Sequence, residues 1–413
     1  MNSFTELQRD HLARHLRKHL AGEVRFDAAS RHLYSTDASI YRMEPLGVVI
    51  PKSAEDIVVT VQIAAEAQVP ITARGGGTSL SGQSIGPGIV IDCSKYLNAI
   101  LDIDAAARVA RIQPGVVLDT FNNALAKHDL QFGPDVATAS RANLGGMIGN
   151  NSAGARSIVY GKTVDHVRRL GVVLADGSRA SFGPLRPDEW ERRGEARGLE
   201  GSIFQQVRDI VRQEREEIER RFPRILRRVS GYNLDVLSAG LNANGEPPGS
   251  SRRAVGLHQL IVGSEGTLAV ITEAEVGLLP RPKVRGLLVP QFATFSAAMD
   301  AVAACLEMQP SAVELMDHLL LQLTAQNLAL RDTMKAIQGQ PQAVLMVEFS
   351  SDDPAEVADR VERLRRRLQG VNGLTAAVPA LDPSLRDPLW SLRRAAMPLL
   401  YSMTGDRKPV TFI

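Results

Sequence analysis

The chain has 413 residues, of which 44% are hydrophobic and 23% charged, and its formal net charge is +2. This composition is typical of a globular protein with two or three domains, and it argues against nucleic acid as an electrostatic partner. Two cysteines, Cys93 and Cys305, are too few for a disulfide framework or a cysteine-rich metal site. Residues 1–25 lack the apolar core of a signal peptide, and no apolar run is long enough to span a membrane. We therefore expect a cytoplasmic protein with at most peripheral contact at the inner membrane face.

The first predicted elements alternate between helix and strand. Leucines at near-helical spacing over residues 7–20 predict a helix that ends near Gly22, and its three histidines are expected to form a solvated face rather than a metal site. Residues 47–51 and 69–73 predict short strands, and Ser53 caps a helix between them with Asp56 three residues later. This strand–helix–strand order favours parallel strands.

The later elements follow with less regular spacing. Further strands are predicted at residues 88–93, 109–112 and 258–262, a helix at 116–128, and two strands within 167–182 about the turn Asp176-Gly177. Beyond Leu279-Pro280 the pattern restarts with a strand at 286–290 and a helix at 295–305. We place a domain boundary near residue 280.

Three glycine-rich segments stand out because they lie far apart in the sequence: residues 74–82, 143–154 and 262–268. Glycine lets the backbone approach a ligand closely, and successive exposed N–H groups form a concavity that binds anions. Three such segments together predict one large phosphate-bearing cofactor held along its length.

Two common nucleotide motifs do not fit these segments. A P-loop would end at Gly161-Lys162-Thr163, but Arg156 occupies the position of its first glycine. A dinucleotide fingerprint would need a helix after Gly77, where residues 78–84 are instead rich in turn formers.

Taken together and in order, these motifs resemble those of the vanillyl-alcohol oxidase / p-cresol methylhydroxylase (PCMH-type) flavoprotein superfamily. Within it, the chain is similar to the branch that contains D-lactate dehydrogenase, D-2-hydroxyglutarate dehydrogenase and the flavoprotein subunit of glycolate oxidase. The resemblance covers roughly residues 30–413, and residues 34–41 resemble the longer members in which a flavin domain is fused to an iron–sulfur domain. The matching segments are residues 70–82, 133–140, 143–154, 157–161, 231–235 and 263–268.

The resemblance implies an α+β fold. It consists of a lead-in at residues 1–41, a two-subdomain FAD-binding unit at 42–280 (about 42–104 and 105–280), and an incomplete cap or substrate domain at 281–413. FAD would be noncovalent, because neither His166 nor Cys93 lies in a recognisable attachment motif. The residues expected to bind it are Gly75, Gly76, Gly77, Thr78, Ser79, Gly82, Pro134, Thr138, Ala139, Ser140, Gly145, Gly146, Asn150, Ser152, Gly154, Tyr160, Glu265, Gly266 and Ile271.

The same resemblance implies oxidation of a small D-2-hydroxy acid, of the lactate, glycolate or 2-hydroxyglutarate type, to its 2-oxo acid. Arg393, in the segment that starts at Trp390, and Lys408 would bind the substrate carboxylate, whereas Met397 replaces a threonine of the relatives. The relatives' catalytic base and divalent-metal ligands lie beyond the position of residue 413, as does the iron–sulfur domain of the longer members. Residues 409–413 look like a strand cut short, so we expect a truncated or split chain that binds FAD but is reduced slowly or not at all.

Two alternatives stay open. The chain could be an FAD-binding subunit that works only with a partner carrying the missing half and a quinone or iron–sulfur electron acceptor. It could also be another flavoenzyme of the superfamily, such as a reductase of an enolpyruvyl sugar nucleotide or an alditol oxidase, although residues 231–235 and 390–393 favour the hydroxy-acid branch.

Overall fold

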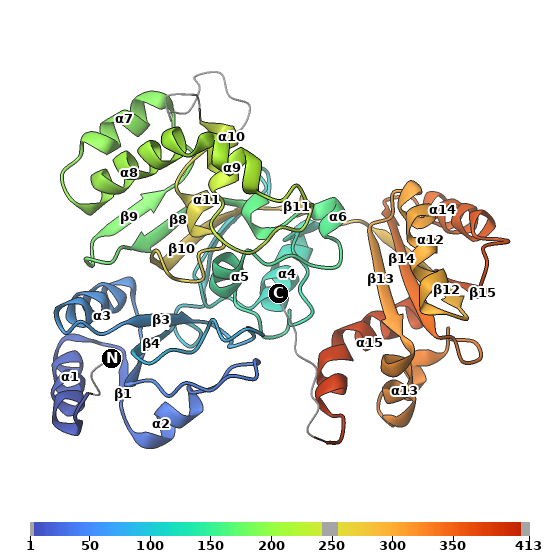
Figure 1. Ribbon diagram of the computed structural model, residues 1–413, viewed down its shortest axis with the longest axis horizontal. Coiled ribbons are helices and arrows are strands. Elements are labelled where there is room, and N and C mark those ends of the chain that lie inside the picture. Colours follow the sequence, from blue (N-terminus) through green and yellow to red (C-terminus); the bar gives the residue numbers. More distant parts are fainter. Residues whose placement is uncertain (1–3, 242–254, 406–413) are drawn as a thin grey trace.

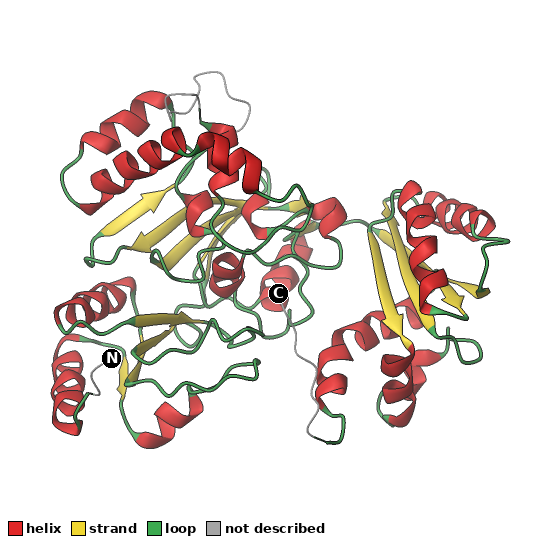
Figure 2. Cartoon of the chain, viewed as in Figure 1, coloured by secondary structure: helices red, strands yellow, loops and turns green. Residues whose placement is uncertain are grey.

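The computed structural model describes residues 4–241 and 255–405 of the chain (Figure 1). Its described part contains three larger β-sheets, of four, five and four strands, and a two-stranded ribbon. Helices lie against each of the larger sheets (Figure 2). This mixture of helices and sheets agrees with the expected α+β class.

The first sheet has the strand order β1-β2-β4-β3. Its strands are β1 (Glu23–Arg25), β2 (Gly47–Ile50), β3 (Ile71–Arg74) and β4 (Ile89–Asp92). The predicted parallel direction of β2 and β3 is confirmed, but the two do not pair with each other, because β4 lies between them and is parallel to both. β1 extends the sheet in the antiparallel direction.

Helices α1 (Glu6–His19) and α3 (Ala54–Glu66) pack together beside this sheet, as Figure 1 shows, and α2 (Ala28–Leu33) follows β1. Ser53 caps α3 as predicted, since its side chain accepts the N–H of Asp56 at 3.2 Å. The Asp56 carboxylate does not complete a capping box; it instead accepts the N–H groups of Lys52 and Ala21. Asp56 therefore ties the end of α1 to the start of α3.

The second sheet is antiparallel throughout, with the order β5-β6-β10-β8-β9. Its strands are β5 (Ile100–Asp104), β6 (Val109–Ile112), β8 (Val167–Val173), β9 (Arg179–Phe182) and β10 (Val270–Gly277). Four helices, α7 (Pro187–Glu195), α8 (Leu199–Gln213), α9 (Arg215–Arg221) and α10 (Leu234–Gly240), form a layer beside it (Figure 1). Trp190 anchors this layer, because its ring meets Phe204 edge to face at 4.9 Å.

Along the chain between β6 and β8, short helices form that include α4 (Leu118–Leu125), α5 (Leu144–Asn150) and α6 (Ser157–Tyr160). The strand predicted at residues 258–262 is wrong, since His258–Ile261 form the single-turn helix α11. The carbonyl of Gly256 accepts the N–H of Gln259, which starts this turn. A short apolar run that is buried on all sides has no periodicity to distinguish helix from strand.

The third sheet has the order β13-β14-β12-β15 and is antiparallel. Its strands are β12 (Val284–Phe292), β13 (Ala312–Asp317), β14 (Ala343–Ser351) and β15 (Leu374–Ala380). The ribbon of β7 (Leu130–Gln131) and β11 (Leu279–Pro280) leads into it. The strand and the helix predicted after residue 280 are confirmed as β12 and α12 (Phe295–Glu307).

Both faces of the third sheet are covered by helices. One core cluster joins α12 and α14 (Pro354–Arg367) to residues such as Leu288 and Val347. The other joins α13 (His318–Gln326) and α15 (Pro383–Tyr401) to Leu287 and Met346. Neighbouring strand residues thus alternate between the two cores, as the pleat requires. None of the described helices is long and apolar enough to cross a membrane.

Candidate functional site

The three glycine-rich segments line one cavity of about 1080 Å³. This volume lies at the upper end of the roughly 300–1000 Å³ that is usual for small-molecule sites. Residues 73–80, 142–156 and 264–271 contribute to its wall, together with parts of 114–139 and residues of α15. Segments far apart in the sequence therefore meet around a space that suits one large ligand.

Most of the residues predicted to bind FAD lie in this wall. Gly82, Pro134 and Ser140 do not line the cavity, although each is close in sequence to residues that do. Lys408 lies outside the described residues. The predicted residues that line the cavity are Gly75, Gly76, Gly77, Thr78, Ser79, Thr138, Ala139, Gly145, Gly146, Asn150, Ser152, Gly154, Tyr160, Glu265, Gly266, Ile271 and Arg393.

The glycines of the wall serve two different purposes. A Cβ added at Gly76 would lie 2.2 Å from the carbonyl oxygen of Arg141, so this glycine lets two backbone segments touch. A Cβ at Gly146 would meet nothing within 4 Å. Because Gly146 borders the cavity without being needed for packing, its bare backbone fits close approach by a ligand. This arrangement fits a nucleotide cofactor such as FAD.

The second and third glycine-rich segments are joined by polar contacts. The side-chain amide of Asn150 donates to Glu265 at 2.9 Å, and Ser152 donates to Asn150 at the same distance. Glu265 has a φ of 53°, which is uncommon for a residue other than glycine. Burial raises the pKa of its carboxyl above the usual value. The two loops are therefore held in a fixed relation on one side of the cavity.

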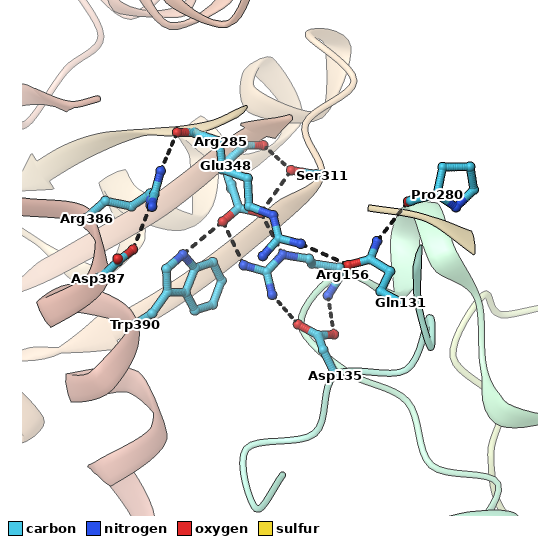
Figure 3. A network of polar contacts seen from close by, with 10 residues as sticks. All are labelled: Gln131, Asp135, Arg156, Pro280, Arg285, Ser311, Glu348, Arg386, Asp387 and Trp390. Atoms are coloured by element: carbon cyan, nitrogen blue, oxygen red, sulfur yellow. Dashed lines mark hydrogen bonds and ion pairs between the residues drawn. The ribbon is translucent and has the colours of Figure 1, made fainter. Parts of the chain in front are cut away.

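A buried ionic network crosses from the glycine-rich segments to the third sheet (Figure 3). Arg156 donates from Nε and Nη2 to the two carboxylate oxygens of Glu348, at 2.6 and 2.7 Å. It also donates from Nη1 to Asp135 at 2.5 Å, and its guanidinium lies 4.5 Å from the centroid of Trp390. The Trp390 indole in turn donates to Glu348 at 2.9 Å.

The charges of this network depend on one another. The Glu348 side chain is fully buried and that of Arg156 is 11% exposed. Burial works against the charge on Arg156, but the bonds to Glu348 and Asp135 more than offset it and raise its pKa. Burial raises the pKa of the Asp135 carboxyl, although Arg156 opposes that shift. The third sheet and the wall of the cavity are therefore joined by one set of compensated charges.

Arg393, the predicted carboxylate ligand, lines the cavity from α15. Its Nε donates to Glu314 on β13, and the Glu314 side chain is only 11% exposed. Met397, one turn further along α15, also borders the cavity. Arg393 thus borders the cavity while its side chain is engaged with an acidic partner.

Two residues considered for covalent flavin attachment differ in their surroundings. Cys93 borders the cavity, but its thiol is buried and burial raises its pKa to about 12. His166 contacts the carbonyl oxygen of Tyr160 at 2.6 Å, and burial lowers its pKa. A buried thiol with a raised pKa is a poor nucleophile, which agrees with a noncovalent cofactor. Among the described residues, no cluster of three or more His, Cys, Asp or Glu side chains could hold a metal ion.

Sequence reasoning missed the acidic and basic residues of the network. The sequence marks Arg156 only as a mismatch to a P-loop, and Asp135 only as part of the segment that starts at Gly133. Glu348 belongs to no motif, and it lies in an apolar strand 192 positions after its partner Arg156. A charged residue within an otherwise apolar strand was the one available hint.

Comparison with known proteins identifies two regions. Residues 45–183 match the family model described as "FAD binding domain", and residues 281–413 match "FAD linked oxidases, C-terminal domain". D-2-hydroxyglutarate dehydrogenase of Pseudomonas putida is 31% identical over 95% of this chain, and the alignment covers 39% of that protein. The chain therefore spans well under half of the length of this relative.

Two further similarities are informative. Glycolate oxidase subunit GlcD of Bacillus subtilis is 28% identical over 95% of this chain and 70% of its own length. A solved structure described as alkyldihydroxyacetonephosphate synthase superposes on 95% of this chain and 64% of its own, with a TM-score of 0.66 and 18% identity. At that identity, the structural match shows a shared fold.

Proposed function

Because this chain belongs to the PCMH-type family of FAD-linked oxidases, we propose that its cavity holds FAD noncovalently and serves the oxidation of a D-2-hydroxy acid. The observation that carries the proposal is the convergence of three glycine-rich segments and helix α15 on one cavity. The names of the relatives, D-2-hydroxyglutarate dehydrogenase and glycolate oxidase subunit, support the substrate class.

FAD bound there would supply the acceptor for the hydride of the hydroxy acid. The backbone of residues 75–79 would bind the anionic diphosphate through N–H groups. Residues of the second segment, including Gly145 and Gly146, would allow the flavin to approach closely. Among the described residues we assign no general base.

Arg393 would orient the substrate by binding its carboxylate, since a guanidinium forms two parallel hydrogen bonds to such a group. Glu314, which now holds Arg393, would keep the guanidinium in place for this task. Lys408 is proposed as a second carboxylate ligand on the evidence of the sequence alone.

The electron acceptor is proposed to be a quinone or an iron–sulfur centre, carried on a separate subunit or polypeptide. The glycolate oxidase relative is itself named as a subunit, which supports this arrangement. The alternative role, an FAD-binding subunit active only with its partner, differs from the first in whether this chain alone turns over substrate.

The test starts with FAD binding. Purified protein is incubated with FAD, desalted and examined by absorption spectroscopy, and we expect stoichiometric flavin bands. Absence of bound flavin would contradict the proposal. D-lactate, glycolate and D-2-hydroxyglutarate are then added anaerobically, with L-lactate and L-2-hydroxyglutarate as matched controls.

We expect one of the D-acids to reduce the flavin, rapidly if this chain turns over substrate alone and slowly if it works only with a partner subunit. Rapid bleaching by one acid without a partner would contradict the alternative role as a subunit. Equal bleaching by both enantiomers would contradict the proposed stereochemistry.

A further inference from the structure

Arg285 reaches the cavity from the start of strand β12, where it is partly buried. Its side chain makes one hydrogen bond, from Nη2 to the amide oxygen of Gln131 at 3.0 Å (Figure 3). Among the described residues, no carboxylate lies within ion-pair distance of its guanidinium. A guanidinium carries five N–H donors, so most of the hydrogen-bonding capacity of Arg285 is unused.

The nearby carboxylates cannot serve Arg285, because other groups occupy them. Glu348 accepts two hydrogen bonds from Arg156, one from Trp390 and one from Ser311. Asp135 accepts the backbone N–H of Arg156 on one oxygen and its Nη1 on the other. The two arginines, Arg156 and Arg285, and the two carboxylates carry no net charge together. Of the two arginines, however, Arg156 alone donates hydrogen bonds to the carboxylates.

The position of Arg285 is electrostatically unfavourable for a cation. Burial lowers its pKa and the neighbouring Arg156 lowers it further, while the negative charges of Glu348 and Asp135 offset these effects only in part. A partly buried arginine with a single neutral partner is uncommon, since charged groups in protein interiors are usually paired. An anion that entered the cavity would satisfy the remaining donors and offset the repulsion by Arg156.

We propose that Arg285 binds the second carboxylate of the substrate, so that the site selects 2-hydroxy acids that are dicarboxylates. This assignment rests on the proposed function. Arg393 belongs to helix α15 and Arg285 to strand β12, so the two arginines line the cavity from different elements. One would hold the carboxylate beside the reacting carbon, and the other would recognise the far end.

A monocarboxylate would leave Arg285 as it is, without an anionic partner. A site built around a buried polar group discriminates strongly against ligands that fail to satisfy it. A pair of charge-assisted hydrogen bonds is expected to favour a dicarboxylate by about tenfold or more.

The experiment compares two unreactive acids, glutarate and butyrate, which differ in the second carboxylate. Their dissociation constants for the FAD-loaded protein are measured by isothermal titration calorimetry. We expect wild type to bind glutarate at least about tenfold more tightly than butyrate. Arg285→Gln should abolish that preference and leave butyrate binding unchanged.

Arg281→Gln is the matched control, because Arg281 also borders the cavity but is exposed. It removes the same charge and should keep the preference for glutarate. Arg285→Lys keeps the charge with fewer donors and should retain part of the preference.

The proposal is overturned if wild type binds the two acids equally, or if Arg285→Gln keeps the preference. If Arg285→Gln fails to fold, the wild-type comparison and Arg285→Lys still decide. Calorimetry also separates this assignment from the proposed function: failure to take up FAD refutes the latter, whereas acid binding by the FAD-free protein still reports on Arg285.

Discussion

The most direct test of the ionic network is the substitution Glu348→Gln. Glutamine keeps the shape of the side chain and one acceptor oxygen, but its NH₂ group would face N–H donors of Arg156 or Trp390. Because the Glu348 side chain is fully buried, water cannot replace the lost acceptor. Asp135 would then be the one carboxylate that pairs with Arg156.

The expected loss of stability follows from this geometry. Removing one partner of a buried ion pair typically costs about 3–5 kcal/mol. Arg156 keeps a second carboxylate and Glu348→Gln keeps one acceptor, so we expect the lower end, about 3 kcal/mol. Replacing both partners, as in Arg156→Met with Glu348→Leu, should cost less than the sum of the two single changes.

The assay is a double-mutant cycle on unfolding in urea, followed by tryptophan fluorescence because Trp390 belongs to the network. A chain with several sheets need not unfold in one step, so the transition that reports Trp390 is the one to analyse. The exposed pair Arg111 and Glu273, 2.7 Å apart, provides the control, and Glu273→Gln should change the midpoint little. If the effects at Arg156 and Glu348 add to within about 0.5 kcal/mol, the network is not cooperative and the reasoning fails.

Three further predictions follow from other parts of the chain. Gly154→Ala would place a Cβ 2.0 Å from Asp135 Oδ1 and should lower the melting temperature. Gly146→Ala has open space at its Cβ, so it should leave the melting temperature unchanged and weaken FAD binding in a fluorescence titration. Burial lowers the pKa of His258 from the usual 6.5 to about 4. Below pH 6.5 the unfolded chain therefore binds a proton at His258 that the folded chain does not, so the free energy of unfolding falls by about 3 kcal/mol between pH 6.5 and pH 4. His258→Leu should lack this part of the decline when unfolding in urea is compared at the two pH values. Arg393→Gln should weaken butyrate binding about tenfold in calorimetry without altering FAD content, and unchanged binding would remove Arg393 from the site.

Much of the architecture could be predicted because its signals are local. Glycine-rich turns, the Ser53 cap and the strand β12 each depend on residues close in sequence. The partners of the strands could not be predicted in the same way: nothing in residues 47–73 shows that β4 would lie between β2 and β3. Residues 258–262 predict a strand where the chain forms a helical turn, because a short and largely buried run carries no periodic signal.

The candidate site likewise has one part that could be predicted from the sequence and one part that could not. Its backbone part, made of glycines that border the cavity, could be predicted from composition and spacing together with the family resemblance. Its ionic part depends on Arg156 meeting Glu348 across 192 positions, and on Gln131 meeting Arg285 across 154. Such contacts form only when the third sheet docks against the glycine-rich segments, so no short motif encodes them.

Arg156 belongs to both the backbone part and the ionic part of the candidate site, so it couples ligand binding to the stability of the fold. It follows the second glycine-rich segment directly, and its backbone N–H binds Asp135 while its side chain holds Glu348 in the third sheet. A change at Glu348 disturbs mainly the attachment of the third sheet, since that residue lies on β14, outside the cavity lining. A change at Arg156 alters the cavity wall and the attachment together. We therefore expect Arg156→Met to lower both FAD affinity and stability, whereas Glu348→Gln should lower stability with a smaller effect on FAD affinity.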